Sequence, residues 1–62
     1  MKVEIQLHSG RWLAFDNVAE TDAEEDFGHV FLTLYNEGGE LMGSVAMSSI
    51  ESVAYIEEDG DE

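Results

Sequence analysis

Strict alternation of apolar and polar side chains at the start of the chain limits the folds that this sequence can adopt. Between residues 2 and 8, Val3, Ile5 and Leu7 alternate with four polar side chains. Successive side chains of a strand point to opposite faces of a sheet, so the pattern predicts a strand with one buried face. No stretch keeps the 3.6-residue period of an amphipathic helix, and the chain has no proline. The sequence therefore predicts an all-β fold.

The turn after this first strand decides which face of the second strand is buried. A two-residue loop would place Leu13 and Phe15 opposite polar residues of the first strand. A three-residue loop, His8-Ser9-Gly10 with its glycine in the left-handed conformation, instead pairs Leu13 with Ile5 and Phe15 with Val3. A one-residue slip moves every side chain to the other face, so the apolar pattern favours the three-residue loop.

Further alternation predicts five short antiparallel strands, at residues 2–8, 11–18, 28–35, 40–47 and 53–57. Residues 19–26 are expected to form a long acidic loop, and residues 48–51 one helical turn with a serine cap. Gly43 marks a place where the strand bends or another chain approaches. The expected core consists of Val3, Ile5, Leu7, Leu13, Phe15, Val30, Leu32, Leu34, Leu41, Val45 and Ile56. Five short strands would leave exposed edges in a flat sheet, so we expect an SH3-like small barrel or a strongly twisted sheet.

The length predicts one small β domain over residues 1–57, followed by a flexible acidic tail at residues 58–62. Chains of about 60 residues are close to the lower limit for folding alone, and self-association is one way to stabilise them. The chain has no cysteine, which excludes disulfides and thiolate metal sites. No apolar run is long enough to span a membrane, and residues 1–4 lack the pattern of a signal peptide. We therefore expect a cytoplasmic protein, located in the host cytoplasm if a phage encodes it.

Two segments resemble known small barrels. Leu7-His8-Ser9-Gly10-Arg11 between two strands is similar to the strand–turn–strand signature of Sm-like and SH3-like barrels, and residues 45–56 look like the end of the same barrels. In layout and acidity the chain is also similar to small acidic proteins of actinobacteria and their phages. The resemblance implies the fold. It does not imply the RNA binding of Sm-like proteins, because Asn36 stands beside Glu37 and the loop lacks basic residues.

Net charge limits the classes of partner. The chain has fifteen acidic and two basic residues, a formal net charge of −13 at pH 7. Proteins hold nucleic acid with lysine and arginine, so direct binding to nucleic acid is excluded. Acidic residues concentrate at residues 20–26 and 57–62. A basic protein surface is the partner that such a distribution favours.

Patterns typical of catalysis or of metal binding are lacking. His8 and His29 have no metal-ligand spacing, and the acidic clusters lack the ligand ladder of a calcium loop. The serines have no nucleophile motif, and the glycine pair at residues 38–39 is not followed by a lysine. We therefore expect no enzymatic activity, no cofactor and no metal.

The favoured hypothesis is an acidic protein-binding module, such as a phage or mobile-element inhibitor or regulator that presents a nucleic-acid-like negative surface to a basic, nucleic-acid-binding protein. The predicted partner-binding residues are Asp22, Glu24, Glu25, Asp26, Glu37 and Glu40, with Trp12 or Tyr35 as an apolar anchor. The alternative is a small structural or assembly protein, a virion or complex component, whose charge serves solubility or adaptation to high salt. Two interpretations apply to the side chains opposite the main apolar set, which are Trp12, Phe31, Tyr35, Met42 and Tyr55. They either cover strand ends and cap the core, or form an exposed patch that suits a homodimer or a basic-rimmed partner.

Overall fold

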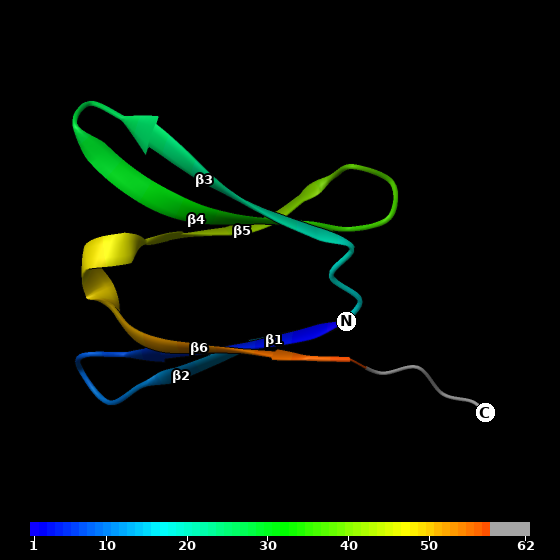
Figure 1. The fold of residues 1–62 in the computed structure, drawn as a ribbon, viewed down its shortest axis with the longest axis horizontal. Coiled ribbons are helices and arrows are strands. Elements are labelled where there is room, and N and C mark those ends of the chain that lie inside the picture. The colour runs from blue at the N-terminus through cyan, green and yellow to red at the C-terminus, as the bar shows by residue number, and fades with distance from the viewer. Residues whose placement is uncertain (58–62) are drawn as a thin grey trace.

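The computed structural model describes residues 1–57, which form six strands and one short turn of 3₁₀ helix. The elements are β1 (Lys2–Leu7), β2 (Trp12–Phe15), β3 (Glu20–Asp26), β4 (His29–Tyr35), β5 (Leu41–Ala46), η1 (Met47–Ser49) and β6 (Ile50–Ile56). They build two antiparallel sheets, with strand orders β2-β1-β6 and β3-β4-β5, which lie one above the other in Figure 1.

The all-β prediction is confirmed, but the predicted number of five strands is wrong. Within residues 1–57 the two sheets do not close into a barrel, and the likeness to SH3-like barrels stays a prediction. The predicted acidic tail at residues 58–62 lies outside the described residues. The longest helical segment of the described part is the three-residue η1, so no helix there is long and apolar enough to cross a membrane.

The hairpin of β1 and β2 has the predicted register. Val3 lies opposite Phe15 and Ile5 lies opposite Leu13. The connecting loop has the predicted three residues, and Gly10 has a φ of 94°, a conformation that glycine adopts without steric cost. The strand β2 is shorter than predicted, because the chain leaves it after Phe15 and crosses to the other sheet.

The acidic segment at residues 19–26, predicted to be a loop, is mostly the strand β3. It pairs with β4 along its whole length, and Thr21 and Ala23 lie opposite Leu34 and Leu32. Acidic residues have low strand propensity, but pairing with a neighbouring strand can outweigh this intrinsic preference. The two strands are joined by Phe27-Gly28, whose positive φ angles of 52° and 82° are those of a type I′ hairpin turn.

The core lies between the two sheets and holds five buried apolar side chains. These are Val3, Ile5, Val18, Leu32 and Leu34. Partly buried side chains surround them: Met1, Leu7, Leu13, Phe15, Met42, Val45, Ile50 and Val53. Eight of the eleven predicted core residues are therefore placed in or against the core, and Val18 becomes a central member of it.

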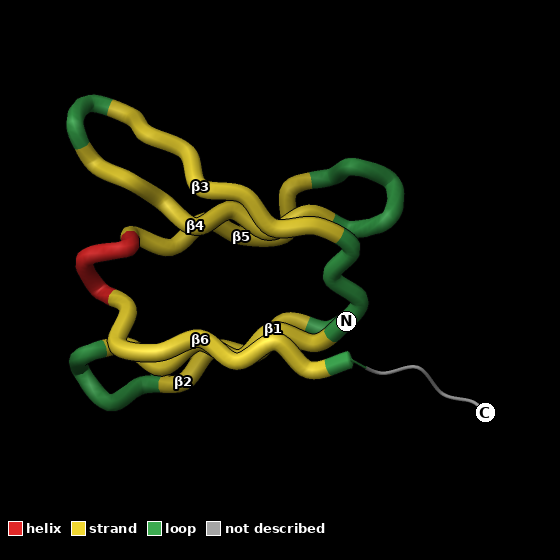
Figure 2. The backbone as a smooth tube through the Cα atoms, in the orientation of Figure 1, coloured by secondary structure: helices red, strands yellow, loops and turns green. Residues whose placement is uncertain are grey.

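Three predicted core residues are exposed instead. Val30 is close to the tip of the β3–β4 hairpin, which projects away from the other sheet in Figure 2. Ile56 lies opposite Lys2 and therefore shares the outer face of its sheet. Leu41 lies opposite Tyr35, because a register shift in the β4–β5 pairing exchanges the faces of Leu41 and Met42.

Backbone hydrogen bonds tie the sheets together at both ends of the core. The Val18 N–H donates to the carbonyl of Met1 at 2.8 Å, and the Ala19 N–H donates to the carbonyl of Tyr35 at 2.8 Å. At the other end, the His8 N–H donates to the carbonyl of Ser49 in η1 at 3.0 Å. The predicted helical turn exists, but it begins at Met47 and has no side-chain cap, and β6 starts at once after it.

Gly43 allows the two sheets to approach closely. A Cβ atom at this position would lie 2.8 Å from Cε2 and 3.0 Å from Cζ of Phe15. The predicted close approach at Gly43 is therefore made by an aromatic ring of the same chain.

We expect Gly43→Ala to lower the free energy of unfolding by about 1–3 kcal/mol, the usual cost of overpacking a core. Gly38→Ala is the matched control, since a Cβ atom there would have only an ordinary contact of 3.5 Å with Asn36. Urea denaturation of the two variants measures the difference. Adding Phe15→Leu to Gly43→Ala should recover part of the loss, and strictly additive effects would contradict the contact.

Candidate protein-binding surface

A row of four carboxylates lies on the outer face of β3. Alternate residues of a strand share a face, which places Glu20, Asp22, Glu24 and Asp26 together on the face away from the core. Neighbouring members of the row are separated by about 6.8 Å along the strand. Across the sheet they lie opposite Tyr35, Thr33, Phe31 and His29 of β4. The outer face of this hairpin thus carries an acidic row beside a partly aromatic one.

The carboxylates of this row have no cationic partner among residues 1–57. The ion pairs of the described residues are Lys2–Glu4 at 3.7 Å and His8–Glu51 at 4.0 Å, both made by the β2-β1-β6 half of the molecule. Residues 16–49 hold eight acidic residues and neither lysine nor arginine. By contrast, residues 1–15 and 50–57 hold both basic residues and three acidic ones, a net charge of −1. The negative charge of the described residues is therefore concentrated on one sheet.

Two side chains of β4 donate hydrogen bonds to β3, one of them to a carboxylate of the row. The Tyr35 hydroxyl donates a hydrogen bond of 2.8 Å to Oε2 of Glu24, and the Thr33 hydroxyl donates one of 3.2 Å to the carbonyl of Asp22. Hydrogen bonding with Thr33 lowers the pKa of Tyr35, but the hydrogen bond to Glu24 and the charges of Glu24 and Asp22 raise it. The raising effects prevail, so the pKa of Tyr35 lies above its usual value.

Phe27 is the most exposed large apolar side chain of the described residues. It is 94% exposed at the tip of the hairpin, between Asp26 and Gly28. Its φ of 52° is in the left-handed region, which costs a non-glycine residue about 1–2 kcal/mol. Neither burial nor backbone preference favours phenylalanine at this position. Strain of this kind is often retained at functional sites.

The structure brings together only part of the predicted partner-binding set. Asp22, Glu24 and Asp26 share the acidic row, whereas Glu25 lies opposite Val30 on the other face of the hairpin. Glu37 and Glu40 belong to the connection between β4 and β5, at the end of β4 away from the hairpin tip.

Three further residues of the predicted partner-binding set make contacts within the molecule or lie on the opposite sheet. The Asn36 side-chain amide donates to Oε1 of Glu40 at 3.1 Å, so this carboxylate belongs to the turn. Trp12 lies on the opposite sheet. Tyr35 is half-buried, and its hydroxyl is hydrogen-bonded to Glu24. The sequence prediction missed Glu20 and Phe27. The glycine after Phe27 was the available signal for a hairpin turn.

The predicted aromatic patch does not form as a single surface. Phe31 and Tyr35 lie on the outer face of the acidic sheet, and Trp12 lies on the outer face of the other sheet. Tyr55 lies opposite Val3 on the edge strand β6, and Met42 packs against the core. A homodimer through one common aromatic patch therefore has no support in this arrangement.

An open hollow of about 640 Å³ lies at the other end of the acidic sheet. Its lining residues are Met1, Asn17, Val18, Ala19, Asn36, Glu37, Gly38 and Glu57. The side-chain oxygen of Asn36 accepts hydrogen bonds from the backbone of Gly38 and Glu40, at 2.9 and 3.0 Å, so it serves the turn. Within residues 1–57, no group of three or more histidine, aspartate or glutamate side chains is placed to hold a metal ion. Comparisons with protein-family models, curated proteins and solved structures found no match to this chain.

We expect Glu24→Gln to lower the pKa of Tyr35, because the substitution removes the negative charge that favours the protonated phenol. A raised pKa in the folded state stabilises the fold below the usual tyrosine pKa, and this contribution disappears as pH rises through the folded value. Titration of tyrosinate absorbance in a Tyr55→Phe background measures Tyr35 alone. Glu25→Gln, on the opposite face, is the control, and equal shifts in the two variants would contradict the specific contact.

Proposed function

We propose that this chain is a non-enzymatic protein-binding module that presents a nucleic-acid-like row of negative charge to a basic partner. The partner is a nucleic-acid-binding protein that the chain inhibits or regulates. The observation that carries the proposal is the row Glu20, Asp22, Glu24 and Asp26, whose four carboxylates share one face and have no cationic partner in residues 1–57. Charges left unpaired at a surface attract an oppositely charged surface and steer its approach.

The dimensions of the row suit a surface that tracks a phosphate backbone. Its four carboxylates extend over about 20 Å of strand, with about 6.8 Å between neighbours. One DNA strand carries a charge about every 3.4 Å along its axis. The row therefore offers about half of that linear charge density, on a strand that is hydrogen-bonded to β4 along its length.

Phe27 is the better candidate for the apolar anchor than Trp12 or Tyr35. Electrostatic attraction sets the rate and the salt dependence of association, whereas a buried aromatic side chain usually supplies much of the affinity. Phe27 is 94% exposed and directly follows the acidic row at the hairpin tip. Its ring can enter an apolar pocket of the partner while the carboxylates meet basic side chains beside that pocket.

The uneven distribution of charge favours binding over a purely solubilising role. Adaptation to high salt or a need for solubility would be served by acidic residues on both sheets. Instead, residues 16–49 carry eight negative charges, whereas the remainder of residues 1–57 carries a net charge of −1. A role as a virion or complex component remains the alternative that experiments can distinguish.

Affinity capture from the native host at low and high salt tests the proposal. We expect a basic, nucleic-acid-binding protein to be retained at low salt and released at high salt, and nucleic acid to compete for it. Recovery of the chain as a stoichiometric component of a particle, or binding that nucleic acid does not displace, would contradict the proposed function.

Neutralising the row should weaken the captured complex at least tenfold at low salt. The test variant combines Glu20→Gln, Asp22→Asn, Glu24→Gln and Asp26→Asn. The matched control removes the same number of charges elsewhere, by Asp16→Asn, Glu37→Gln, Glu51→Gln and Glu57→Gln. Titration calorimetry measures both dissociation constants. Equal losses would show that net charge matters and that the row is not the binding site.

Replacing Phe27 by asparagine should change stability and binding in opposite directions. Asparagine-glycine is the preferred pair for a type I′ turn, so Phe27→Asn should raise the free energy of unfolding by about 1 kcal/mol. The same change should weaken the complex, because it removes the anchor. Thermal melting and calorimetry give the two readouts. Unchanged affinity in the more stable variant would exclude Phe27 from the interface.

A further inference from the structure

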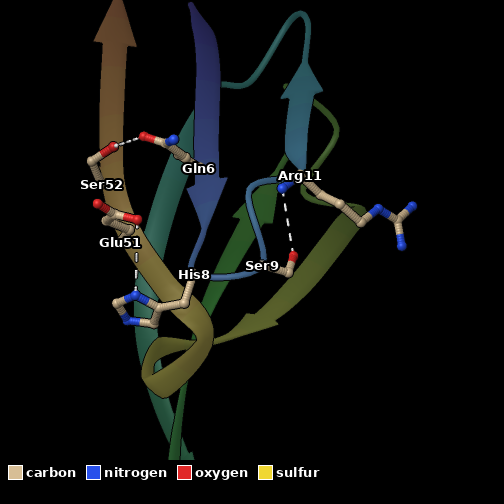
Figure 3. Close-up of polar contacts among 6 residues, drawn as sticks. All are labelled: Gln6, His8, Ser9, Arg11, Glu51 and Ser52. Atoms are coloured by element: carbon tan, nitrogen blue, oxygen red, sulfur yellow. Dashed lines mark hydrogen bonds and ion pairs between the residues drawn. The ribbon is translucent and has the colours of Figure 1, made fainter.

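The outer face of the β2-β1-β6 sheet carries little net charge on an otherwise acidic molecule. The strand registers place eight side chains on this face: Lys2, Glu4, Gln6, Trp12, Ala14, Ser52, Ala54 and Ile56. One of the eight is basic and one is acidic, and Glu51 adds a second carboxylate beside Ser52 (Figure 3). By comparison, the whole chain has a net charge of −13. This face is therefore the part of the described surface on which two copies of the chain would repel each other least.

The polar side chains of this face already contact one another. Nζ of Lys2 lies 3.7 Å from Oε2 of Glu4. The Ser52 hydroxyl donates a hydrogen bond of 3.3 Å to Oε1 of Gln6 (Figure 3). Covering these paired groups leaves fewer polar atoms unsatisfied than covering free ones would. The alanines at positions 14 and 54 flank Glu4 on the two neighbouring strands, so the middle of the face has no bulky projections.

Exposed apolar side chains lie at two corners of the face. Trp12 is 58% exposed on β2, opposite Gln6, and Ile56 is 39% exposed on β6, opposite Lys2. Tryptophan in particular is enriched where proteins meet. The face thus combines exposed apolar side chains, small residues and a low net charge.

We propose that a second copy of this chain covers this face, in a symmetric dimer with the two β2-β1-β6 sheets packed against each other. In such a dimer the acidic sheets lie on the outside, because each occupies the far layer of its own copy in Figure 1. A basic partner is drawn to the acidic sheet instead. The outer face of the β2-β1-β6 sheet fits a copy of itself, because a two-fold axis brings the same weakly charged surface to both sides.

The dimensions of the face predict a weak dimer. Three strands about 4.8 Å apart and about 20 Å long cover about 300 Å². A stable interface of standard size buries about 800 Å² on each partner. Repulsion between two acidic copies weakens association further, and salt screens this repulsion. Added salt therefore strengthens the dimer, whereas it weakens a complex with a basic partner.

Sedimentation velocity over a range of protein concentrations, at low and high salt, tests the proposal on the unmodified chain. Trp12 is the single tryptophan of the chain and reports on its own face. We expect a dimer that becomes more populated with concentration and with salt, accompanied by a blue shift of tryptophan emission. A monomer under all conditions, or a dimer with unchanged emission, would overturn the proposal.

Added negative charge locates the interface. Ala54→Glu places a carboxylate on each side of the proposed contact and should raise the dimer dissociation constant at least tenfold. Gly38→Glu adds the same charge in the β4–β5 turn and should leave the constant within about twofold after salt screening. Ala14→Glu serves as a second test should Ala54→Glu fail to fold, as judged by circular dichroism. A larger effect of Gly38→Glu would place the contact elsewhere and overturn the proposal.

Discussion

Burial of apolar side chains between the central strands β1 and β4 holds the two sheets together. Val3 and Ile5 from β1 share one core with Leu32 and Leu34 from β4, and Val18 joins them from the crossing between the sheets. Neither sheet has more than three short strands, and so small a sheet requires a packed face to be stable. The fold therefore depends on contacts among a few apolar side chains. The two sheets must approach closely for these side chains to meet.

This core occupies only part of the acidic sheet, and the remaining part is free to carry charge. The tip of the β3–β4 hairpin diverges from the opposite sheet in Figure 2, so Ala23, Glu25 and Val30 are exposed on its inner side as well. Carboxylates there keep their water on both faces and avoid the desolvation cost of burial. The other sheet contributes Val3 and Ile5 to the core, and both basic residues lie in it or in its β1–β2 connection. Packing and charge are thus divided between different regions of a very small protein.

Local patterns in the sequence predicted those features of the fold that depend on residues close together in the chain. Period-two alternation and Gly10 were sufficient to predict the β1–β2 register, because the register and the turn must agree. The strand β3 was missed because its acidic composition is typical of a loop, and only pairing with β4 makes it a strand. The exchange of Leu41 and Met42 follows from a register shift between β4 and β5, which alternation cannot reveal.

The residues of the proposed binding surface were likewise only partly predictable from local sequence patterns. The sequence identified acidic residues at 22, 24 and 26 as candidates, but only the strand conformation separates them from Glu25 and adds Glu20.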